Sequence, residues 1–335
     1  MKAVMLLEPH KLEVQDVPEP EMAPDQIKVK VAYSGICGTD PEIVEGRFMP
    51  PEWKPGPNII GHEAAGTIVA IGSQIKGDFH IGQKVAMNFR SSCGACYYCN
   101  NRMEHFCVNL TPNSGAMAEY AVYKENTVFP LPDDTPLDVA AFVEPVAVAV
   151  HMMDIAGMKI GDTVLITGGG TIGQLLLQFA LKSGASKVMV SEPVESKRKI
   201  ALEMGADMVV DPLHDNLKEA AMKLTDGRGF NLCMEASGIP SVAKEMVYLA
   251  DQCGLILWCA VYPRDMEIGV NAFYMYQHEL TIKSVLVSPY SFIRAAAMLP
   301  KLNLKPLITV YPVDDVVKAF ADHKAGKGVK VMLKM

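Results

Sequence analysis

The sequence predicts an α/β protein in which a mainly β region is joined to a doubly wound parallel sheet. Before about residue 148, short β-type runs such as KVKVAYSGI and AEYAVY are separated by Gly and Pro. From about residue 150, apolar strands alternate with helix-like segments, beginning with DTVLITGG and TIGQLLLQFALKSG. This alternation is typical of a parallel sheet with helices on both faces. Past residue 287, a strand, a helix and a final strand follow in a mixed pattern.

The length and composition set limits on the class of protein. A chain of 335 residues, 50% hydrophobic and 21% charged, is long enough for two domains and is not typical of disorder. The formal net charge of -7 argues against a nucleic acid or an anionic membrane as the partner. The sequence has neither a long apolar run nor a signal-peptide pattern at MKAVMLLEPH, so we expect a cytoplasmic protein without a membrane span.

A glycine-rich motif follows the strand DTVLIT. Gly168, Gly170 and Gly173 form G-x-G-x-x-G, and Thr171 and Ile172 open the helix. The first glycine permits a tight turn, the second lets the backbone approach a pyrophosphate, and the third lets helix and strand pack closely. With a strand before it and a helix after it, the motif predicts a dinucleotide site at the helix N-terminus.

An acidic residue, Glu192, lies about 20 residues further on, at the end of the next strand. A carboxylate there accepts hydrogen bonds from the adenosine ribose and repels a 2′-phosphate, so the sequence favours NAD over NADP. Lys197, Arg198 and Lys199 follow, and a basic side chain such as Lys197 could contact the cofactor and weaken that preference. The alternative for these three residues is a solvated helix face.

Four cysteines are clustered within fifteen residues. Cys93, Cys96, Cys99 and Cys107 have the spacing C-x2-C-x2-C-x7-C, which suits one tetrahedral zinc ion. An iron–sulfur cluster is the alternative, but no other redox signal accompanies the motif. Because all four positions are cysteines, no place is left for water, and we expect a structural zinc site.

A second group of candidate ligands is dispersed along the chain. Cys37 lies in SGICGTD, His62 and Glu63 lie in IIGHEAAG, and Glu144 lies in AAFVEPVAVAV. Glu144 is the only charge in an apolar run, and a buried carboxylate needs a partner such as a metal ion. Taken alone, a cysteine or a histidine in such a place is more often structural, and the alternative for Glu144 is a paired glutamate of the core.

Five motifs in this order, GICGTD, GHEAAG, the four-cysteine cluster, VEPVAVAVH and GGGTIG, make the sequence resemble the zinc-containing medium-chain dehydrogenases. The resemblance covers essentially the full length. It implies a chaperonin-10-like catalytic β domain from residues 1–148 and 288–335, with a Rossmann domain inserted at 149–287. It also implies two zinc ions, one catalytic and one structural, and an NAD-dependent hydride transfer.

The resemblance also assigns roles to residues of the dispersed group. Cys37 and His62 would be catalytic zinc ligands, and Thr39 would pass on the substrate proton. Glu144 stands where simpler alcohol dehydrogenases have a second cysteine, as in the sorbitol, galactitol-phosphate and threonine dehydrogenase branch. In that branch Glu63 or Glu144 completes the shell, directly or through water. One departure is Glu42, which stands where many relatives have a histidine that ends the proton relay.

These features lead us to expect an enzyme that oxidises a polyol, a sugar alcohol or a sugar derivative, since oxygen-rich zinc ligation suits neighbouring hydroxyls. A threonine-like amino alcohol is the alternative substrate. Two alternative functions belong to other classes of protein: a zinc-free quinone reductase and a non-catalytic nucleotide- or zinc-binding module. The dispersed ligands and Thr39 speak against both. We further expect a homodimer or a homotetramer, as in relatives.

Overall fold

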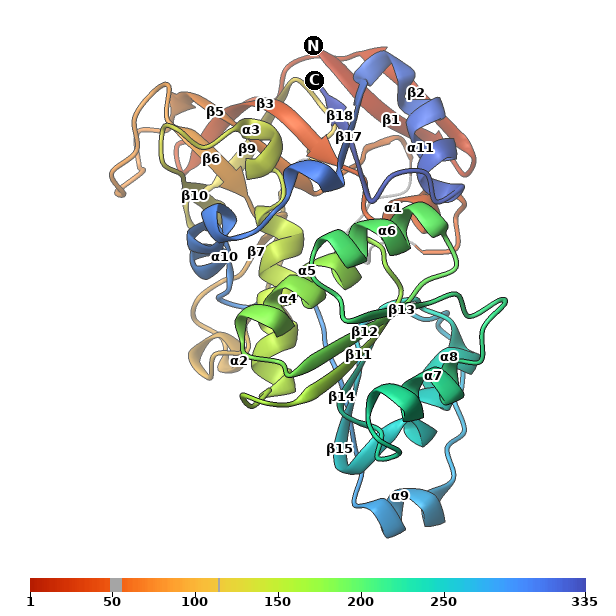
Figure 1. Ribbon diagram of the computed structural model, residues 1–335. Helices are drawn as coiled ribbons and strands as arrows, with labels where there is room; N and C mark the ends of the chain where they lie inside the picture. Colours follow the sequence, from red (N-terminus) through yellow and green to blue (C-terminus); the bar gives the residue numbers. More distant parts are fainter. Residues whose placement is uncertain (49–55, 114) are drawn as a thin grey trace. The chain divides into compact units, whose positions relative to one another are not determined.

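The computed structural model describes residues 1–48, 56–113 and 115–335, and the chain divides into two compact units (Figure 1). The first unit contains residues 1–147 and 288–335, and the second contains residues 148–287. Both ends of the chain therefore belong to the first unit.

The main sheet of the first unit has the strand order β10-β6-β5-β3-β18-β17, and β9 also pairs with β3. Its strands are β3 (Gln26–Gly35), β5 (Glu63–Ile71), β6 (Lys84–Met87), β9 (Tyr120–Lys124), β10 (Val128–Pro130), β17 (Ile308–Pro312) and β18 (Lys330–Lys334). The final strand, β18, pairs antiparallel with β3. The C-terminal segment thus completes a sheet that begins near the N-terminus.

Two smaller sheets accompany it. They consist of β1 (Lys2–Glu8), β2 (Lys11–Asp16) and β4 (Asn58–Ile59), and of β7 (Arg90–Ser91) with β8 (Thr111–Pro112). The β1–β2 hairpin is absent from the strands expected from sequence, although KLEVQD alternates apolar with charged or polar residues, a pattern typical of a half-buried strand. Its turn contains His10, whose φ of 67° lies in the left-handed region.

The helices of the first unit are short and connect these strands. They are α1 (Thr39–Val44), α2 (Tyr97–Asn100), α3 (Leu137–Ala140), α10 (Phe292–Met298) and α11 (Val316–Lys324), with 3₁₀ turns η1 (Glu104–Phe106), η2 (Glu125–Thr127), η4 (Leu299–Lys301), η5 (Lys305–Leu307) and η6 (Val313–Asp315). Helix α4 (Val143–Ala156) begins in the first unit and continues into the second.

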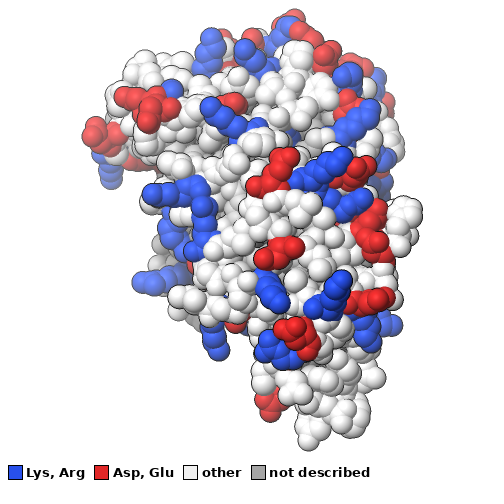
Figure 2. Space-filling model, in the orientation of Figure 1, with Lys and Arg blue, Asp and Glu red and all other residues white. Residues whose placement is uncertain are grey.

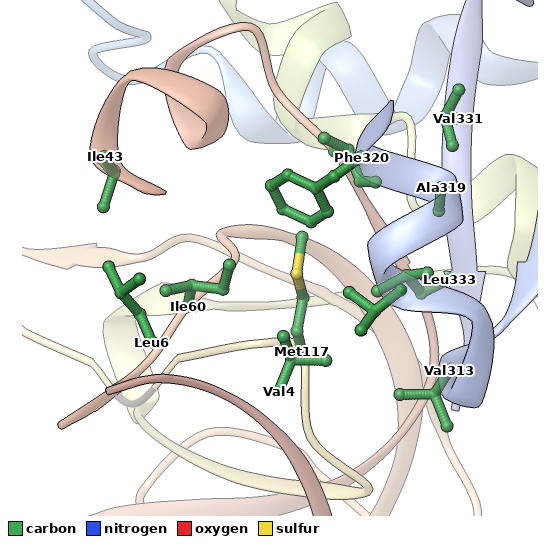
Figure 3. Close-up of a cluster of buried hydrophobic side chains, with 12 residues drawn as sticks. Val4, Leu6, Ile43, Ile60, Met117, Val313, Ala319, Phe320, Val331 and Leu333 are labelled. Atoms are coloured by element: carbon green, nitrogen blue, oxygen red, sulfur yellow. The ribbon is translucent and has the colours of Figure 1, made fainter. Parts of the chain in front are cut away.

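One hydrophobic core of the first unit packs α11 against strands from both ends of the chain. In Figure 3 the side chain of Met117 points toward the ring of Phe320, with Val331 and Leu333 of β18 nearby. Val4 of β1 belongs to the same buried cluster. Because β18 contributes to this core, its register in the main sheet is strongly specified.

The second unit is built on a parallel sheet with the order β13-β12-β11-β14-β15-β16. Its strands are β11 (Thr163–Thr167), β12 (Lys187–Ser191), β13 (Met208–Val210), β14 (Phe230–Glu235), β15 (Ala250–Trp258) and β16 (Thr281–Ser284). The strand order reverses between β11 and β14. In open parallel sheets, ligands bind at the carboxyl ends of the strands at such a point.

The helices of the second unit are α5 (Thr171–Lys182), α6 (Glu195–Glu203), α7 (Leu217–Leu224), α8 (Pro240–Glu245) and α9 (Ala272–His278), with the 3₁₀ turn η3 (Met246–Tyr248). Helix α5 is buried over most of its length, and its three consecutive leucines, Leu175 to Leu177, are inaccessible to solvent. This burial fixes the N-terminus of α5 beside the end of β11.

Figure 2 shows acidic and basic side chains interspersed over the face that it draws. Within the described ranges, no helix has the length and apolar character needed to span a bilayer.

Candidate active site

The antiparallel register of β3 and β5 brings the dispersed zinc-ligand candidates together. Gly35, at the end of β3, lies opposite Glu63, at the start of β5. Cys37 follows the end of β3, and His62 immediately precedes β5. A Cβ atom at Gly35 would overlap the Glu63 carboxylate, so the glycine leaves room for that side chain.

Donor atoms of Cys37, His62 and Glu63 all lie within 4.8 Å of one another. A thiolate, an imidazole and a carboxylate form a donor set that suits zinc. Burial raises the pKa of Cys37, but the charge and hydrogen bond of His62, together with the charge of Lys330, outweigh this effect, and the net pKa is below the usual value. The thiolate is the form of cysteine that binds metals, so the local electrostatics fit a zinc ligand.

Asp40 is a member of this site that sequence reasoning did not identify. One of its oxygens accepts a hydrogen bond from the Cys37 backbone N–H at 2.8 Å, and the other lies 3.4 Å from Nδ1 of His62. Burial lowers the pKa of His62, but Asp40 and Cys37 outweigh this effect and raise it well above its usual value. A carboxylate on one imidazole nitrogen orients the other toward a metal. The signal was present in GICGTD, three residues after Cys37.

Lys330 is the second residue that sequence reasoning missed. It is 1% exposed at the start of β18, forms an ion pair with Glu63 and donates a hydrogen bond to the Ile36 carbonyl at 3.1 Å. Burial lowers the pKa of Lys330 to about 8, even though Cys37 and Asp40 act to raise it. The available signal was a lysine between buried valines in GVKVMLKM.

Glu144, in the first turn of α4, is 6% exposed but does not belong to the close group of donor atoms. Burial raises its pKa to about 7, while His62 lowers it and Asp40 raises it. Among the described residues, no lysine or arginine forms an ion pair with Glu144. Glu144 is therefore a buried carboxylate that interacts electrostatically with His62 and Asp40. It is not one of the three residues, Cys37, His62 and Glu63, whose donor atoms lie close together.

Thr39 begins helix α1, and its hydroxyl oxygen lies 3.7 Å from the sulfur of Cys37. Glu42, three residues later, is held by Arg47 through two hydrogen bonds of 2.7 and 2.6 Å. The hydrogen bond from Arg47 lowers the pKa of Glu42. Glu42 is thus a paired carboxylate with reduced affinity for a proton, whereas the Thr39 hydroxyl lies beside the donor set.

The four-cysteine cluster forms a second group of candidate ligands. The sulfur atoms of Cys93, Cys96, Cys99 and Cys107 all lie within 4.8 Å of one another. Backbone N–H groups near Ala95 and Cys96 lower the pKa of Cys93 to about 6, and burial raises that of Cys99 to about 12. Four sulfurs at this spacing fit one tetrahedral zinc ion.

The loop between β11 and α5 fits a dinucleotide. Gly168 has a φ of +95°, which favours glycine, and a Cβ atom at Gly173 would overlap the Gly168 carbonyl oxygen. A Cβ atom at Gly170 would meet nothing within 4 Å, so the space before this backbone is open. Thr171 and Ile172 form the first turn of α5, whose N-terminus favours a phosphate.

Glu192 follows β12 and reaches the same loop. It is 5% exposed, and its carboxylate accepts hydrogen bonds from the N–H groups of Gly169 at 2.6 Å and Val194 at 2.9 Å. Arg198 donates to the carbonyls of Glu192 and Pro193, both at 2.7 Å. The guanidinium is therefore held by backbone oxygens, and a fixed negative charge stands at the end of β12.

The three basic residues that follow Glu192, at positions 197 to 199, each have different interaction partners. The guanidinium of Arg198 also pairs with Asp211 at 3.0 Å, and Lys199 pairs with Glu195 at 2.7 Å on the exposed face of α6. Lys197 is half-buried, and its backbone carbonyl accepts a hydrogen bond from Gln174 of α5 at 3.1 Å. Lys199 thus lies on a solvated helix face, while the backbone of Lys197 is tied to the helix that begins at the glycine loop.

Comparison with known proteins gives two family matches. Residues 23–133 match the alcohol dehydrogenase GroES-like domain, and residues 171–303 match the zinc-binding dehydrogenase family. The L-threonine 3-dehydrogenase of Thermococcus kodakarensis is 33% identical over 99% of this chain and 97% of that protein.

Solved structures give the same result. A zinc-binding dehydrogenase from Sinorhizobium meliloti 1021 bound to NADP has a TM-score of 0.93 and 30% identity, covering 100% of this chain and 99% of its own. Galactitol-1-phosphate dehydrogenase from Escherichia coli has a TM-score of 0.88 and 27% identity, with full coverage of both chains. The resemblance and fold class expected from sequence are confirmed, and the chain belongs to the zinc-binding dehydrogenases, as an oxidoreductase with zinc and a nicotinamide cofactor.

Proposed function

We propose that this enzyme oxidises a secondary alcohol of the polyol, sugar-alcohol or sugar-derivative class, with NAD as the hydride acceptor. The grouping of Cys37 and His62 with a carboxylate, Glu63, rather than with a second thiolate carries this proposal. Oxygen ligands make the site harder and better suited to a substrate with two neighbouring hydroxyls.

In the proposed site, Cys37 and His62 hold the catalytic zinc, and Glu63 or Glu144 completes its shell. Zinc supplies a Lewis acid that lowers the pKa of the substrate hydroxyl. Asp40 orients His62, and Lys330 neutralises the buried charge of Glu63. Thr39 accepts the substrate proton at its hydroxyl oxygen and passes it on. The four-cysteine cluster holds the second, structural zinc.

The second unit holds the cofactor. The N-terminus of α5 faces the pyrophosphate, with Gly170 and Thr171 at the point of approach, and Gly173 lets α5 pack on the loop. Glu192 accepts hydrogen bonds from the adenosine ribose and disfavours a 2′-phosphate. Arg198 is already held by backbone carbonyls and Asp211, which supports the preference for NAD. Lys197 remains a candidate ribose contact.

A threonine-like amino alcohol is the second candidate substrate, because the L-threonine 3-dehydrogenase of Pyrococcus horikoshii and that of Thermococcus kodakarensis are each 33% identical over 99% of the chain. A threonine carboxylate needs a cation in the site. Within the described part of the chain, Lys330 contacts the zinc-ligand group and is already paired with Glu63. This pairing favours a neutral polyol.

A substrate screen that follows NADH absorbance tests the proposal. Sorbitol, galactitol, 2,3-butanediol, galactitol 1-phosphate and L-threonine would each be supplied with NAD to the zinc-loaded enzyme. We expect the highest kcat/KM for a polyol or its phosphate. A higher kcat/KM for L-threonine than for every polyol would replace the first candidate with the second. No NADH formation with any alcohol would contradict both.

We also propose a homodimer or homotetramer in the cytoplasm. None of the eight cysteines forms a disulfide in the described part of the chain, which is consistent with a reducing compartment, and the edge strand β16 offers a surface that can extend the parallel sheet across two copies. Light scattering on the purified protein would give the mass of the assembly. A mass corresponding to one chain would contradict the oligomer.

A further inference from the structure

Glu235, the last residue of β14, is a fully buried carboxylate that belongs to neither group of zinc-ligand candidates. It lies outside the glycine loop and is distinct from Glu192. A carboxylate with no exposure is costly to bury, so its environment must supply compensating interactions.

The compensating groups are neutral hydrogen-bond donors. One oxygen of Glu235 accepts from the backbone N–H groups of Ser237 at 2.7 Å and Gly238 at 3.1 Å, and from the Thr167 hydroxyl at 3.4 Å. The Ser237 hydroxyl donates to the same oxygen, and the Tyr262 hydroxyl donates to the other. These bonds stabilise the ionised carboxylate and fix its position, but none of these donors carries a compensating positive charge.

The position of Glu235 in the sheet places this charge at the ligand-binding edge. Thr167, Glu235 and Tyr262 lie at or just beyond the carboxyl ends of β11, β14 and β15, on both sides of the point where the strand order reverses. The glycine loop packs directly on the turn that Glu235 holds, since a Cβ atom at Gly168 would lie 2.8 Å from the Ala236 carbonyl oxygen.

Glu192 and Glu235 belong to different halves of the fold. Glu192 follows β12 and marks the adenosine half of a dinucleotide, whereas Glu235 ends β14, in the half beyond the reversal. A dinucleotide that crosses this point has its nicotinamide half on the β14 side.

We propose that Glu235 is a positioning residue whose buried negative charge favours the oxidised cofactor over the reduced one. The proposal rests on the nicotinamide dinucleotide of the proposed function. The oxidised nicotinamide ring carries a positive charge and the reduced ring carries none. A fixed anion on that side of the sheet therefore stabilises bound NAD⁺ relative to bound NADH. A purely structural Glu235 would affect both forms equally.

The test is the ratio of dissociation constants for NAD⁺ and NADH, measured by calorimetry and by fluorescence titration of the holoenzyme. Glu235→Gln keeps the shape and removes the charge, so the ratio Kd(NAD⁺)/Kd(NADH) should rise about threefold to tenfold. Glu245→Gln removes an exposed charge from α8 and is the matched control, with the ratio of the unaltered enzyme. An unchanged ratio in folded Glu235→Gln would overturn the proposal.

A second pair of variants covers the case in which Glu235→Gln does not fold. Tyr262→Lys places a cation against Glu235 and should raise the ratio, whereas Tyr262→Phe removes one donor, leaves the anion and should keep the ratio. Equal ratios in these two variants would also overturn the proposal. Failure of the unaltered enzyme to bind either cofactor form would instead contradict the proposed function, so the two failures can be told apart.

Discussion

The carboxylate of Glu63 and the ammonium group of Lys330 form an ion pair in which both side chains are almost fully buried. The residues are 267 positions apart in the chain and are brought together by β3, β5 and β18, neighbours in one sheet. Glu63 also belongs to the group with Cys37 and His62. The pair therefore links the stability of the first unit to its candidate metal site.

Replacing Lys330 should reveal this link. Lys330→Met leaves the Glu63 carboxylate buried without a cation and should lower the free energy of unfolding of the chelator-treated protein by about 3–5 kcal/mol. Denaturant titration measures this change. Added zinc should raise the melting temperature of this variant more than that of the unaltered protein, because the metal replaces the lost charge.

Two controls separate charge pairing from packing. Lys334→Met, at an exposed position of the same strand, should leave stability nearly unchanged. Glu63→Gln combined with Lys330→Met removes both charges and should recover part of the stability lost in Lys330→Met. If the single Lys330 variant were as stable as the unaltered protein, the ion pair would have no such role.

Glu192 should determine the preference for NAD. Glu192→Ser removes the charge at the end of β12 and its hydrogen bonds to the ribose, so kcat/KM for NAD should fall about tenfold. Efficiency with NADP should rise because the repulsion of the 2′-phosphate is lost. Steady-state kinetics with both cofactors measure the two effects. Equal efficiency with NAD and NADP in the unaltered enzyme would refute this role for Glu192.

Thr39 should carry the substrate proton. Thr39→Val keeps the side-chain shape and removes the hydroxyl, so the rate of hydride transfer should fall by about 10²-fold or more. Thr39→Ser is the matched control and should stay active, because it keeps the hydroxyl. Single-turnover absorbance measures the step, and NADH binding should be unaffected. A valine variant with full activity would exclude the relay.

Glu144 should act on the catalytic zinc, directly or through one water. Glu144→Gln is nearly isosteric but neutral and should reduce the affinity of that zinc by about 10- to 100-fold, as loss of a ligand or of its orienting partner does. Turnover should fall with it, while cofactor binding and the four-cysteine zinc persist. Competition with a metal chelator gives the affinity. Retention of zinc at the unaltered affinity would remove Glu144 from the metal site.

Features that depend on local sequence could be predicted well. The glycine loop needs only a strand, three glycines and a helix in succession, and the four cysteines lie within fifteen residues. The apolar strands β11 and β12 and helix α5 lie where their patterns indicated, to within two residues at either end. In each case the physical cause of the structure is contained in a short segment.

Features that depend on strand register could not be read from sequence. Lys330 looks like one of two charges in an otherwise apolar strand, and only the pairing of β18 with β3 places it against Glu63. The role of Asp40, in helix α1, depends on the position of His62, which immediately precedes β5. Glu235 was seen only as part of the strand NLCMEAS, because its donors come from the ends of three strands.

The zinc content of three purified proteins tests the central claim that two separate sites hold zinc. Elemental analysis should give two zinc ions per chain for the unaltered enzyme, and one each for Cys37→Ser and Cys93→Ser. Cys37→Ser should lose activity, because the remaining ion lies in the four-cysteine cluster. A single zinc ion per chain that survives in Cys93→Ser and disappears in Cys37→Ser would contradict the two-site account.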